Sequence, residues 1–452
     1  MPPTLALLLT VAFIVFAISR EKQRAERASL AIIWPFLWYL VTSSRPVGVW
    51  FSIWNIPILS AGGAAEGSPA DRLFYATLTL IGFIVLYQRN LNWSQLFSRN
   101  KLLIAFLVFL FLSITWSDYM SVSFKRYIKL LGSFAMALII LTDRNPLIAL
   151  TTVIRWTALI HVPLSILFIR YFRHLGVSFD WSGTAYAWNG LSTSKNTLGQ
   201  VVVIAAIYFL WEVSKNWKTH KFKSINFVYL LLSLYLLKGS DNSVSMTSVS
   251  IFALSVFIFY QLHRIRNKSQ NYYGFIKLVM TGTFFLLGFM ILHSIYIFSE
   301  DSPLGWLITK LGRDITLTDR TYIWSDVYRI AADSPLLGTG FGGFWIGKIA
   351  NIPWNASMTW VLTQSHSGYI DTYLHTGIIG VIFLVSIINK TSKRLSLFIH
   401  EDFTLGRLLI IIFLAIVYIN ITESTFLRGD HHMWFLFLLT AISIQVPASK
   451  GS

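Results

Sequence analysis

The sequence predicts an all-α, polytopic membrane protein, and three observations support this fold class. Of the 452 residues, 55% are hydrophobic and 16% aromatic, while only 13% carry a formal charge. An ordinary soluble domain has about twice that share of charged residues. The mean hydropathy is +0.60, and the apolar residues gather in long runs separated by short polar gaps. These features exclude a soluble globular enzyme.

Thirteen apolar runs approach the length of a membrane-spanning helix, which is roughly 20 residues with a range of about 17–25. Because several runs are short, we expect 12 or 13 spans. The first run has no basic segment before it and no small-residue cleavage site after it, which is typical of a spanning helix rather than a signal peptide. The runs cover residues 3–19, 28–42, 73–88, 102–116, 124–141, 147–169, 197–213, 225–237, 246–262, 275–298, 369–388, 407–420 and 433–447.

The distribution of basic residues predicts the orientation of these spans. The net charge is +17, from 37 Lys and Arg against 20 Asp and Glu. If all the runs span, 21 of the basic residues lie in alternate short loops, which the positive-inside rule places in the cytoplasm. The longer segments 43–72, 170–196 and 299–368 then face the periplasm or the cell exterior. Basic residues there suit an anionic ligand, and the lack of an aromatic-spaced basic platform argues against nucleic acid.

The segment 299–368 is the only long polar excursion between the apolar runs. A loop of that length is usually functional or disordered, and its many Trp, Phe and Tyr residues argue against disorder. We therefore expect short helices packed on the outer face. The chain divides into N-terminal transmembrane helices (1–298), this large periplasmic loop (299–368) and C-terminal transmembrane helices (369–452), with no internal repeat.

A polar stretch at 191–199 opens one of the predicted spanning helices. Thr193 or Ser194 is placed to cap this helix, and Lys195 adds positive charge to an N-terminus that already favours anions. This interpretation makes the stretch an anion-binding site. The alternative is a simple helix cap beside a lysine that extends toward the membrane interface. The residues alone give the two interpretations equal weight.

Two arginines in the large loop, Arg313 and Arg320, are seven residues apart and would share one face of a continuous helix. Two guanidiniums can bind a diphosphate bidentately. The alternative is a surface network of these arginines with nearby carboxylates. The residue pattern by itself favours that network. Its acidic members would be Asp314, Asp319 and Asp326.

The remaining candidates are single polar side chains. His366 ends the long loop directly before a predicted spanning helix, where a neutral imidazole can take a proton from an attacking hydroxyl. A lone histidine is more often structural. Glu423, near the last outer loop, is a candidate partner for an arginine, while Arg45 and Arg126 face outward. Arg155 lies within an apolar run, where a charge is either functional or neutralised by a buried carboxylate.

Several reaction classes lack the residues they require. There are no cysteines, which excludes disulfides, thiolate chemistry and cysteine metal sites. No H-x-x-x-H pattern, paired-carboxylate spacing or Walker-type loop supports metalloprotease or ATP-hydrolysing chemistry. His431 and His432 make a poor metal site because adjacent helical residues point in different directions. We therefore expect neither a metal nor another cofactor.

Short motifs are spread along most of the chain. They lie at 44–46, 116–118, 123–126, 141–143, 195–199, 317–321 with 323–324, and 334–338 with 340. The most specific is His366-Ser367 followed by Gly377 and Gly380. In order and topology these motifs resemble the O-antigen ligase and polymerase superfamily, especially its exopolysaccharide polymerases of the ExoQ type. One departure is Ser194, where many relatives have a histidine before Lys-Asn.

The resemblance implies a helical, GT-C-like membrane glycosyltransferase that is metal-independent and inverting. Its donor would be a sugar chain on undecaprenyl diphosphate at the periplasmic face of the bacterial inner membrane. By family position, Arg320 would hold the diphosphate, and His366 would position or deprotonate the acceptor hydroxyl. Without a metal, cationic side chains must stabilise the departing diphosphate. The other candidate ligands of diphosphate or sugar are Arg313, Lys195, Asn196, Arg126, Arg45 and Glu423.

The resemblance leaves the acceptor open. A polymerase joins the chain to another lipid-linked repeat, whereas a ligase passes it to lipid A core, and the ExoQ-type resemblance favours the polymerase. Proteins of polysaccharide export and chain-length control would then be its partners. A lipid-linked sugar flippase or other transporter is a competing class with a similar number of spans. Against it, we find no repeated halves and no matching pair of broken helices.

Overall fold

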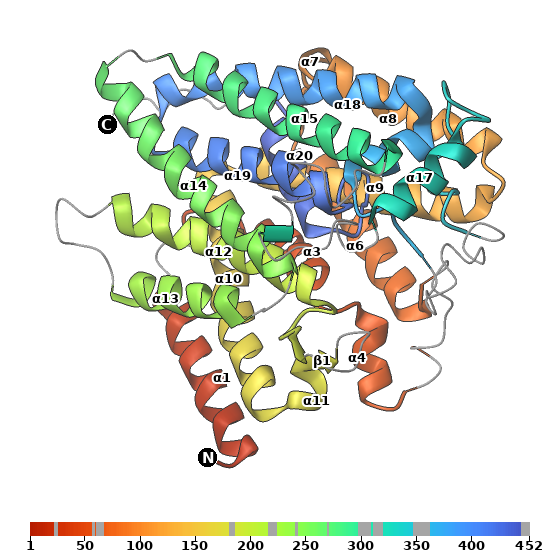
Figure 1. Cartoon of the computed structure of the whole chain (residues 1–452). Helices are drawn as coiled ribbons and strands as arrows, with labels where there is room; N and C mark the ends of the chain where they lie inside the picture. The colour runs from red at the N-terminus through yellow and green to blue at the C-terminus, as the bar shows by residue number, and fades with distance from the viewer. Residues whose placement is uncertain are drawn as a thin grey trace.

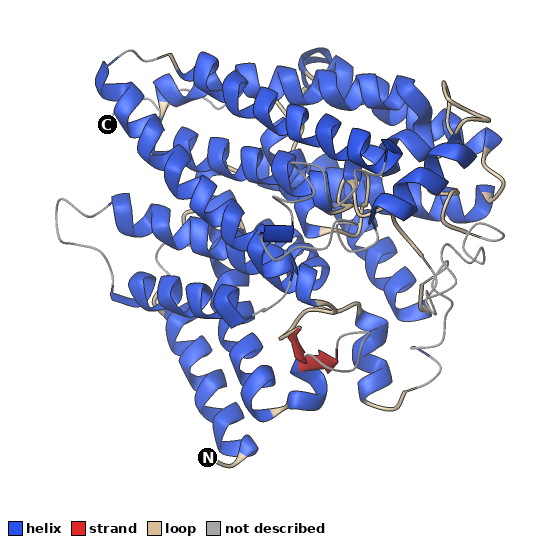
Figure 2. Cartoon of the chain, viewed as in Figure 1, coloured by secondary structure: helices blue, strands red, loops and turns tan. Residues whose placement is uncertain are grey.

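The computed structural model is almost entirely helical over the residues that it describes (Figures 1 and 2). Within these residues, two short strands, β1 (Val177–Phe179) and β2 (Tyr186–Trp188), pair antiparallel. The predicted all-α polytopic membrane protein is confirmed. The described residues are 1–21, 26–56, 59, 67–179, 186–215, 224–239, 243–268, 271–296, 309–310, 320–346 and 362–443.

Every predicted apolar run corresponds to a helix. The longer helices are α1 (Pro3–Ser19), α3 (Ile33–Ser43), α6 (Pro69–Gln88), α8 (Lys101–Leu112), α9 (Met120–Leu141), α10 (Pro146–Tyr171), α12 (Lys195–Lys215), α13 (Ser224–Gly239), α14 (Ser243–Lys268), α15 (Tyr272–Tyr296), α18 (Gly368–Glu401), α19 (Phe403–Thr422) and α20 (His432–Ala441). The shorter ones are η1 (Leu30–Ile32), α4 (Val47–Ile53), α7 (Trp93–Arg99), η2 (Ser113–Trp116), α11 (Arg173–Gly176) and α17 (Arg320–Ala331).

Six helices in the described part are long and apolar enough to cross a bilayer, namely α6, α10, α12, α15, α18 and α19. A seventh is counted if α7 and the helix formed by α8 and η2, which meet at an angle of 91°, make one span. α1, α13, α20 and the helix formed by η1 and α3 are apolar but shorter. The predicted total of 12 or 13 spans therefore stays a prediction.

The last apolar run requires a correction, because α20 ends at Ala441 and not at the predicted residue 447. At this end, the guanidinium of Arg394 donates to the carbonyl oxygens of Thr440 and Ala441. Helix C-termini leave such carbonyls without intrahelical partners. The Arg394 side chain on α18 thus supplies the hydrogen bonds that a longer helix would have supplied.

Burial separates the inner helices of the bundle from those at its edge (Figure 1). In α12 and α19, 83% of the apolar stretch is buried, whereas in α15 the buried share is 22%. A helix that is apolar on every face lies either in a protein core or in contact with lipid. α12 and α19 therefore belong to the core of the bundle, and the apolar surface of α15 is left for lipid.

α18 is broken at Gly377, and a segment of the large loop packs into the break. Gly377 has φ +61°, and a Cβ at this position would overlap the backbone of Leu336. The N–H groups of Ile378 and Ile379 donate to the carbonyl oxygens of Pro335 (2.9 Å) and Leu336 (3.3 Å). Glycine is required here because the loop backbone approaches α18 closely and because φ is positive.

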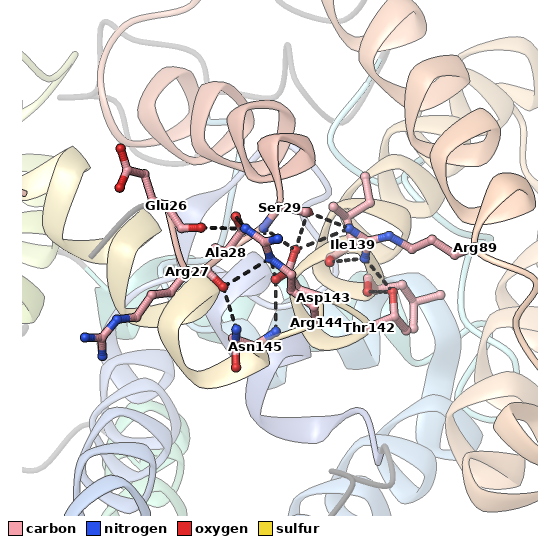
Figure 3. Close-up of polar contacts among 11 residues, drawn as sticks. Glu26, Arg27, Ala28, Ser29, Arg89, Ile139, Thr142, Asp143, Arg144 and Asn145 are labelled. Carbon is pink, nitrogen blue, oxygen red and sulfur yellow. Dashed lines mark hydrogen bonds and ion pairs between the residues drawn. The ribbon is translucent and has the colours of Figure 1, made fainter. Parts of the chain in front are cut away.

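At the end of the bundle where α6 and α9 finish, a polar cluster fixes residues 26–29 to the turn between α9 and α10 (Figure 3). The Asp143 carboxylate accepts from the backbone N–H of Ser29 and forms an ion pair with Arg89 at 3.4 Å. Arg144 donates to the carbonyl oxygens of residues 26–28. We call Ser29, Arg89, Asp143 and Arg144 the Asp143 cluster.

Arg155, inside α10, forms a buried ion pair with Glu21, which follows α1. The Nε–Oε2 distance is 2.9 Å and the Nη2–Oε1 distance is 3.0 Å. Each side chain is only 2% exposed. Of the two interpretations that the sequence left open for Arg155, the structure supports the neutralised charge. The pair joins the end of α1 to α10 and accounts for this arginine without a substrate.

Candidate functional site

His366 adopts an uncommon backbone conformation between the large loop and α18. Its φ is +57°, in the left-handed region that few non-glycine residues occupy. The residue before it is firmly held, because Trp324 Nε1 donates to the Ser365 carbonyl oxygen at 2.7 Å. Strained backbone clusters at functional sites. The conformation therefore supports His366 as a site residue.

Asp371, in the first turn of α18, connects the His366 segment to two other segments. Its carboxylate accepts hydrogen bonds from the Ser365 N–H at 3.0 Å and from Trp345 Nε1 at 3.1 Å. It also accepts from Ser424 Oγ in the loop between α19 and α20, residues 423–431, which the charge distribution predicts to face outward and which we call the last outer loop. A buried carboxylate with these three donors holds all three segments in one arrangement. Asp371 was not predicted, since a single acidic residue in a helix gives no pattern.

Glu423, directly after α19, contacts the first turns of α12 and α17. Its Oε1 accepts from Asn196 Nδ2 at 2.9 Å and from Arg320 Nη2 at 3.3 Å. Burial raises the pKa of the Glu423 carboxyl, and the Arg320 charge and the Asn196 hydrogen bond oppose that shift. The arginine that pairs with Glu423 is thus Arg320. Asp326 pairs instead with Arg329, at 3.6 Å.

The His366 imidazole is neutral at physiological pH. Burial, followed by the positive charges of Arg320 and Arg428, lowers its pKa from 6.5 to about 3. Its Nδ1 is buried and has no hydrogen-bond partner among the residues that the structure describes. A buried nitrogen without a partner is costly in a folded protein. The described residues therefore leave the hydrogen-bonding capacity of this nitrogen unused.

Arg428, in the last outer loop, is a polar residue that the sequence groups with Glu423 without giving it a role in binding or catalysis. Its Nη1 donates to Gln364 Oε1 at 2.8 Å and to the Ser424 carbonyl oxygen at 3.4 Å. Its charge acts on both His366 and Glu423. The one available signal was a basic residue in the same predicted outer loop as Glu423. We call His366, Arg320, Arg428, Glu423 and Asn196 the His366 site.

Arg126 and Lys129 of α9 contact segments next to the His366 site. Lys129 Nζ forms an ion pair with Asp430 at 3.0 Å, and Arg126 Nη1 donates to the Gly342 carbonyl oxygen at 2.6 Å. Burial by itself would raise the pKa of Asp430, but Lys129, Arg428 and Arg126 hold that pKa below its usual range. The charged side chains around the last outer loop therefore include Arg126 and Lys129 of α9.

The first turn of α12 contributes Asn196 to the His366 site, where Asn196 donates a hydrogen bond to Glu423. Ser194 Oγ accepts from the Thr197 N–H at 3.2 Å, so Ser194 is the residue that caps this helix. Lys195 is the first residue of α12. Residue 194, where the sequence departs from the family that it resembles, is thus a helix cap in this chain. Lys195 contributes its charge at a helix N-terminus, which favours anions.

Arg45 does not have the open guanidinium expected of a ligand-binding residue. Its Nε donates to the Leu191 carbonyl oxygen at 3.3 Å, and its Nη2 donates to those of Gly190 (3.2 Å) and Leu175. The residue is 8% exposed. Arg45 therefore fixes the segments before α4 and α12 to each other. Arg313, the other predicted arginine, lies outside the described residues.

The His366 site combines a neutral imidazole, two guanidiniums and one paired carboxylate. The guanidiniums can bind an anionic group, and the imidazole can accept a proton from a nearby hydroxyl. Among the described residues, no group of three or more His, Cys, Asp or Glu side chains is arranged around a common point for a metal ion. The arrangement suits acid–base chemistry next to a bound anion.

Comparison with known proteins shows which proteins this chain is similar to. Residues 228–385, which include Arg320 and His366, match the family model described as O-Antigen ligase. The chain is a multi-pass membrane protein that is similar to this family over that stretch. It is similar to the exopolysaccharide production protein ExoQ of Rhizobium meliloti (strain 1021), with 24% identity over 358 residues that cover 76% of this chain and 77% of that protein. No solved structure matches the chain.

Proposed function

We propose that the chain is an integral-membrane glycosyltransferase of the ExoQ type that polymerises a polysaccharide. It transfers an oligosaccharide from undecaprenyl diphosphate to an acceptor sugar at the periplasmic face of the bacterial inner membrane. The observation that carries this proposal is the Nδ1 of His366, which has no hydrogen-bond partner among the described residues and is subject to the Arg320 charge. It lies within the stretch matched to the O-antigen ligase family. The basic short loops support the proposed orientation.

In the proposed reaction, a hydroxyl of the acceptor sugar attacks the anomeric carbon of the donor on the face opposite the diphosphate. A new carbon–oxygen bond forms as the bond from the anomeric carbon to the diphosphate oxygen breaks, so the configuration inverts. Undecaprenyl diphosphate leaves with the bonding electrons, and Arg320 stabilises the charge that develops on it. The hydroxyl proton passes to His366 and from there to water. No step uses a metal or another cofactor.

Glu423 and Asn196 act on Arg320 in this mechanism. The Glu423 carboxylate accepts one hydrogen bond from Asn196 and one from Arg320, so it orients the Arg320 guanidinium. Orientation matters because a guanidinium binds phosphate through a planar fork of N–H groups. Lys195 is proposed to add charge beside this fork, and Arg126 and Arg313 remain proposed helpers of lower rank.

The acceptor separates two versions of the proposal. Similarity to ExoQ favours a lipid-linked repeat as acceptor, which makes the enzyme a polymerase. The description of the matched family favours the alternative, a ligase that uses lipid A core. Both versions have the same donor and the same leaving group, so the His366 site would act in the same way. Proteins of polysaccharide export and chain-length control are the proposed partners of the polymerase.

The deciding experiment uses the purified protein in liposomes with its native undecaprenyl-diphosphate-linked repeat unit. A product ladder on a gel, with release of undecaprenyl diphosphate, is the result expected of a polymerase. Release that begins only when lipid A core is added would make the protein a ligase. If neither acceptor produces release from a competent native donor, the glycosyltransferase proposal is wrong, and transport of the lipid-linked sugar becomes the favoured function.

A further inference from the structure

We propose that Arg428 is a second phosphate-binding arginine of the His366 site. Together with Arg320 it holds the diphosphate of the lipid-linked donor. This inference rests on the proposed function and adds a residue from the last outer loop to its binding machinery. It is argued from three features: the free edge of the guanidinium, the hydrogen bonds that position it and the groups on which its charge acts.

The guanidinium of Arg428 has one edge occupied and one edge open. Nη1 donates to Gln364 Oε1 and to the Ser424 carbonyl oxygen. Nε and Nη2 have no acceptor among the residues that the structure describes, and the residue is exposed. The Nε–Nη2 edge is one of the two forks through which arginine binds two oxygens of a phosphate. The open edge is therefore the one that bidentate phosphate binding needs.

In three other arginines of the described chain, the Nε–Nη2 edge donates hydrogen bonds to protein acceptors. Arg45 uses Nε and Nη2 on three carbonyl oxygens, and Arg144 uses them on the carbonyl oxygens of residues 26–28. Arg155 uses them on the Glu21 carboxylate. Each of these arginines is accounted for as a structural connection. Among the described residues, only Nη1 of Arg428 has hydrogen-bond acceptors, so its Nε–Nη2 edge is open.

The backbone and the neighbouring loops fix where Arg428 is presented. Leu427, the preceding residue, has φ +61°, and the His431 N–H donates to the Arg428 carbonyl oxygen at 3.0 Å. Gln364, which binds Nη1, is two residues before His366 in the chain. The hydrogen bond thus joins Arg428 directly to the segment that carries the imidazole. A guanidinium held at both its backbone and its tip loses little entropy when it binds a ligand.

Arg428 and Arg320 act on the same two groups. Both charges lower the pKa of His366, and both oppose the raised pKa of Glu423. Glu423 pairs with Arg320, and the nearby Asp430 pairs with Lys129. The two guanidiniums bring two positive charges near one neutral imidazole, and Glu423 balances one of them. A diphosphate supplies a negative charge for each guanidinium and would place the adjoining anomeric carbon near His366.

The test compares Arg428→Gln and Arg428→Lys with Gln364→Ala in the liposome transfer assay. Gln364→Ala removes an acceptor of Arg428 Nη1 but keeps the Arg428 charge. It therefore measures how much of any defect comes from losing this hydrogen bond rather than the charge. Arg329→Gln, on an 81% exposed side chain of α17, controls for a general loss of outer-face charge. KM for the donor and inhibition by inorganic diphosphate are both measured. Inhibition is the readout that a purely structural role would not change selectively.

We expect Arg428→Gln to raise the donor KM about 10- to 100-fold and to weaken inhibition by inorganic diphosphate in parallel. Arg428→Lys should restore the donor KM and the inhibition by diphosphate only in part, since a point charge does not reproduce the planar fork of N–H groups. Arg329→Gln should stay within about twofold of the wild type. Gln364→Ala loosens Arg428 but keeps its charge, so it should raise the donor KM by less than Arg428→Gln does. Equal defects in Arg428→Gln and Gln364→Ala, or wild-type diphosphate inhibition in Arg428→Gln and Arg428→Lys, would overturn the inference. Failure of the proposed function itself is different, because the wild type would then release no undecaprenyl diphosphate.

Discussion

The Asp143 cluster and the His366 site both contain two arginines and a buried carboxylate, yet their hydrogen bonding differs. In the Asp143 cluster, the Arg89 and Arg144 guanidiniums meet carboxylate, hydroxyl or carbonyl oxygens (Figure 3). In the His366 site, His366 Nδ1 lacks a described partner and Arg428 presents an open edge. Leaving a buried polar group unpaired costs about 1–3 kcal/mol.

This difference separates a structural cluster from a functional one. A satisfied network fixes segments relative to each other and has nothing left to offer a ligand. A network with open positions is less stable by itself but can be completed by a bound molecule. The number of arginines, or their charge, does not distinguish the two cases. What distinguishes them is which donors and acceptors remain unused.

The largest expected effect tests the open site directly. His366→Ala should lower kcat by about 10²–10⁴-fold, because the proton acceptor is lost. Arg320→Ala should lower it by about 10²–10³-fold, and Arg320→Lys should restore little, since lysine is a point charge. Transfer from the native donor in liposomes is the measurement, with Arg329→Ala as the control. Full activity in both His366→Ala and Arg320→Ala would remove these residues from the mechanism.

A smaller effect is expected at Asp371, which positions the His366 segment. Asp371→Ala removes the acceptor of Ser365, Trp345 and Ser424, and a slight displacement of His366 should lower kcat about 10- to 100-fold. Asp371→Asn keeps an oxygen for the two N–H donors and can donate to Ser424 Oγ, so it should retain most activity. Steady-state transfer by the two variants decides this. An asparagine variant as inactive as the alanine variant would indicate that the charge is essential.

In the Asp143 cluster, the expected effect is on stability and not on transfer. Arg89→Ala leaves the fully buried Asp143 carboxylate without its ion pair, which should cost about 3 kcal/mol. Specific activity per folded molecule should remain that of the wild type. Thermal unfolding in detergent and transfer assays on the folded fraction measure the two quantities. Loss of transfer at unchanged stability would contradict the distinction between the two clusters.

The smallest effect concerns pH. His366 has a pKa of about 3 because of burial and then the charges of Arg320 and Arg428. It is therefore already neutral at pH 5, and kcat/KM should not show an acid limb near the ordinary histidine value of 6.5. Removing a positive neighbour in Arg428→Gln raises this pKa, so the acid limb should move to higher pH. A wild-type limb near 6.5, measured as kcat/KM against pH, would exclude a buried neutral His366.

Much of the fold was predictable because helix formation in a membrane protein is a local property. A run of about 20 apolar residues must pair its own backbone groups, and a helix does so within the segment. The thirteen runs therefore became helices. The end of α20 was not predictable, because it depends on Arg394 in another helix. The break at Gly377 likewise depends on a loop segment that packs into α18.

The candidate site was predictable only in part. The motifs selected His366, Arg320 and Asn196, and Glu423 was selected as a candidate partner for an arginine. The structure places these four residues together with Arg428. It also shows Arg45 enclosed by carbonyl oxygens, although the sequence places Arg45 and Arg320 alike in segments predicted to face outward. The two arginines differ in their surroundings because their partners are distant in the chain.

By itself, the sequence determined the helical membrane class, the family resemblance and the supply of positive charge in the outer segments. Tertiary structure alone decided which charges are neutralised and which remain open. Arg155 meets Glu21 across 134 positions of the chain, and Arg320 meets Glu423 across 103. Helices that are apolar on every face give no periodic signal for their neighbours. The physical reason is that the length of an apolar run is a property of one stretch of sequence, whereas ion pairs between distant segments form only once the helices have packed.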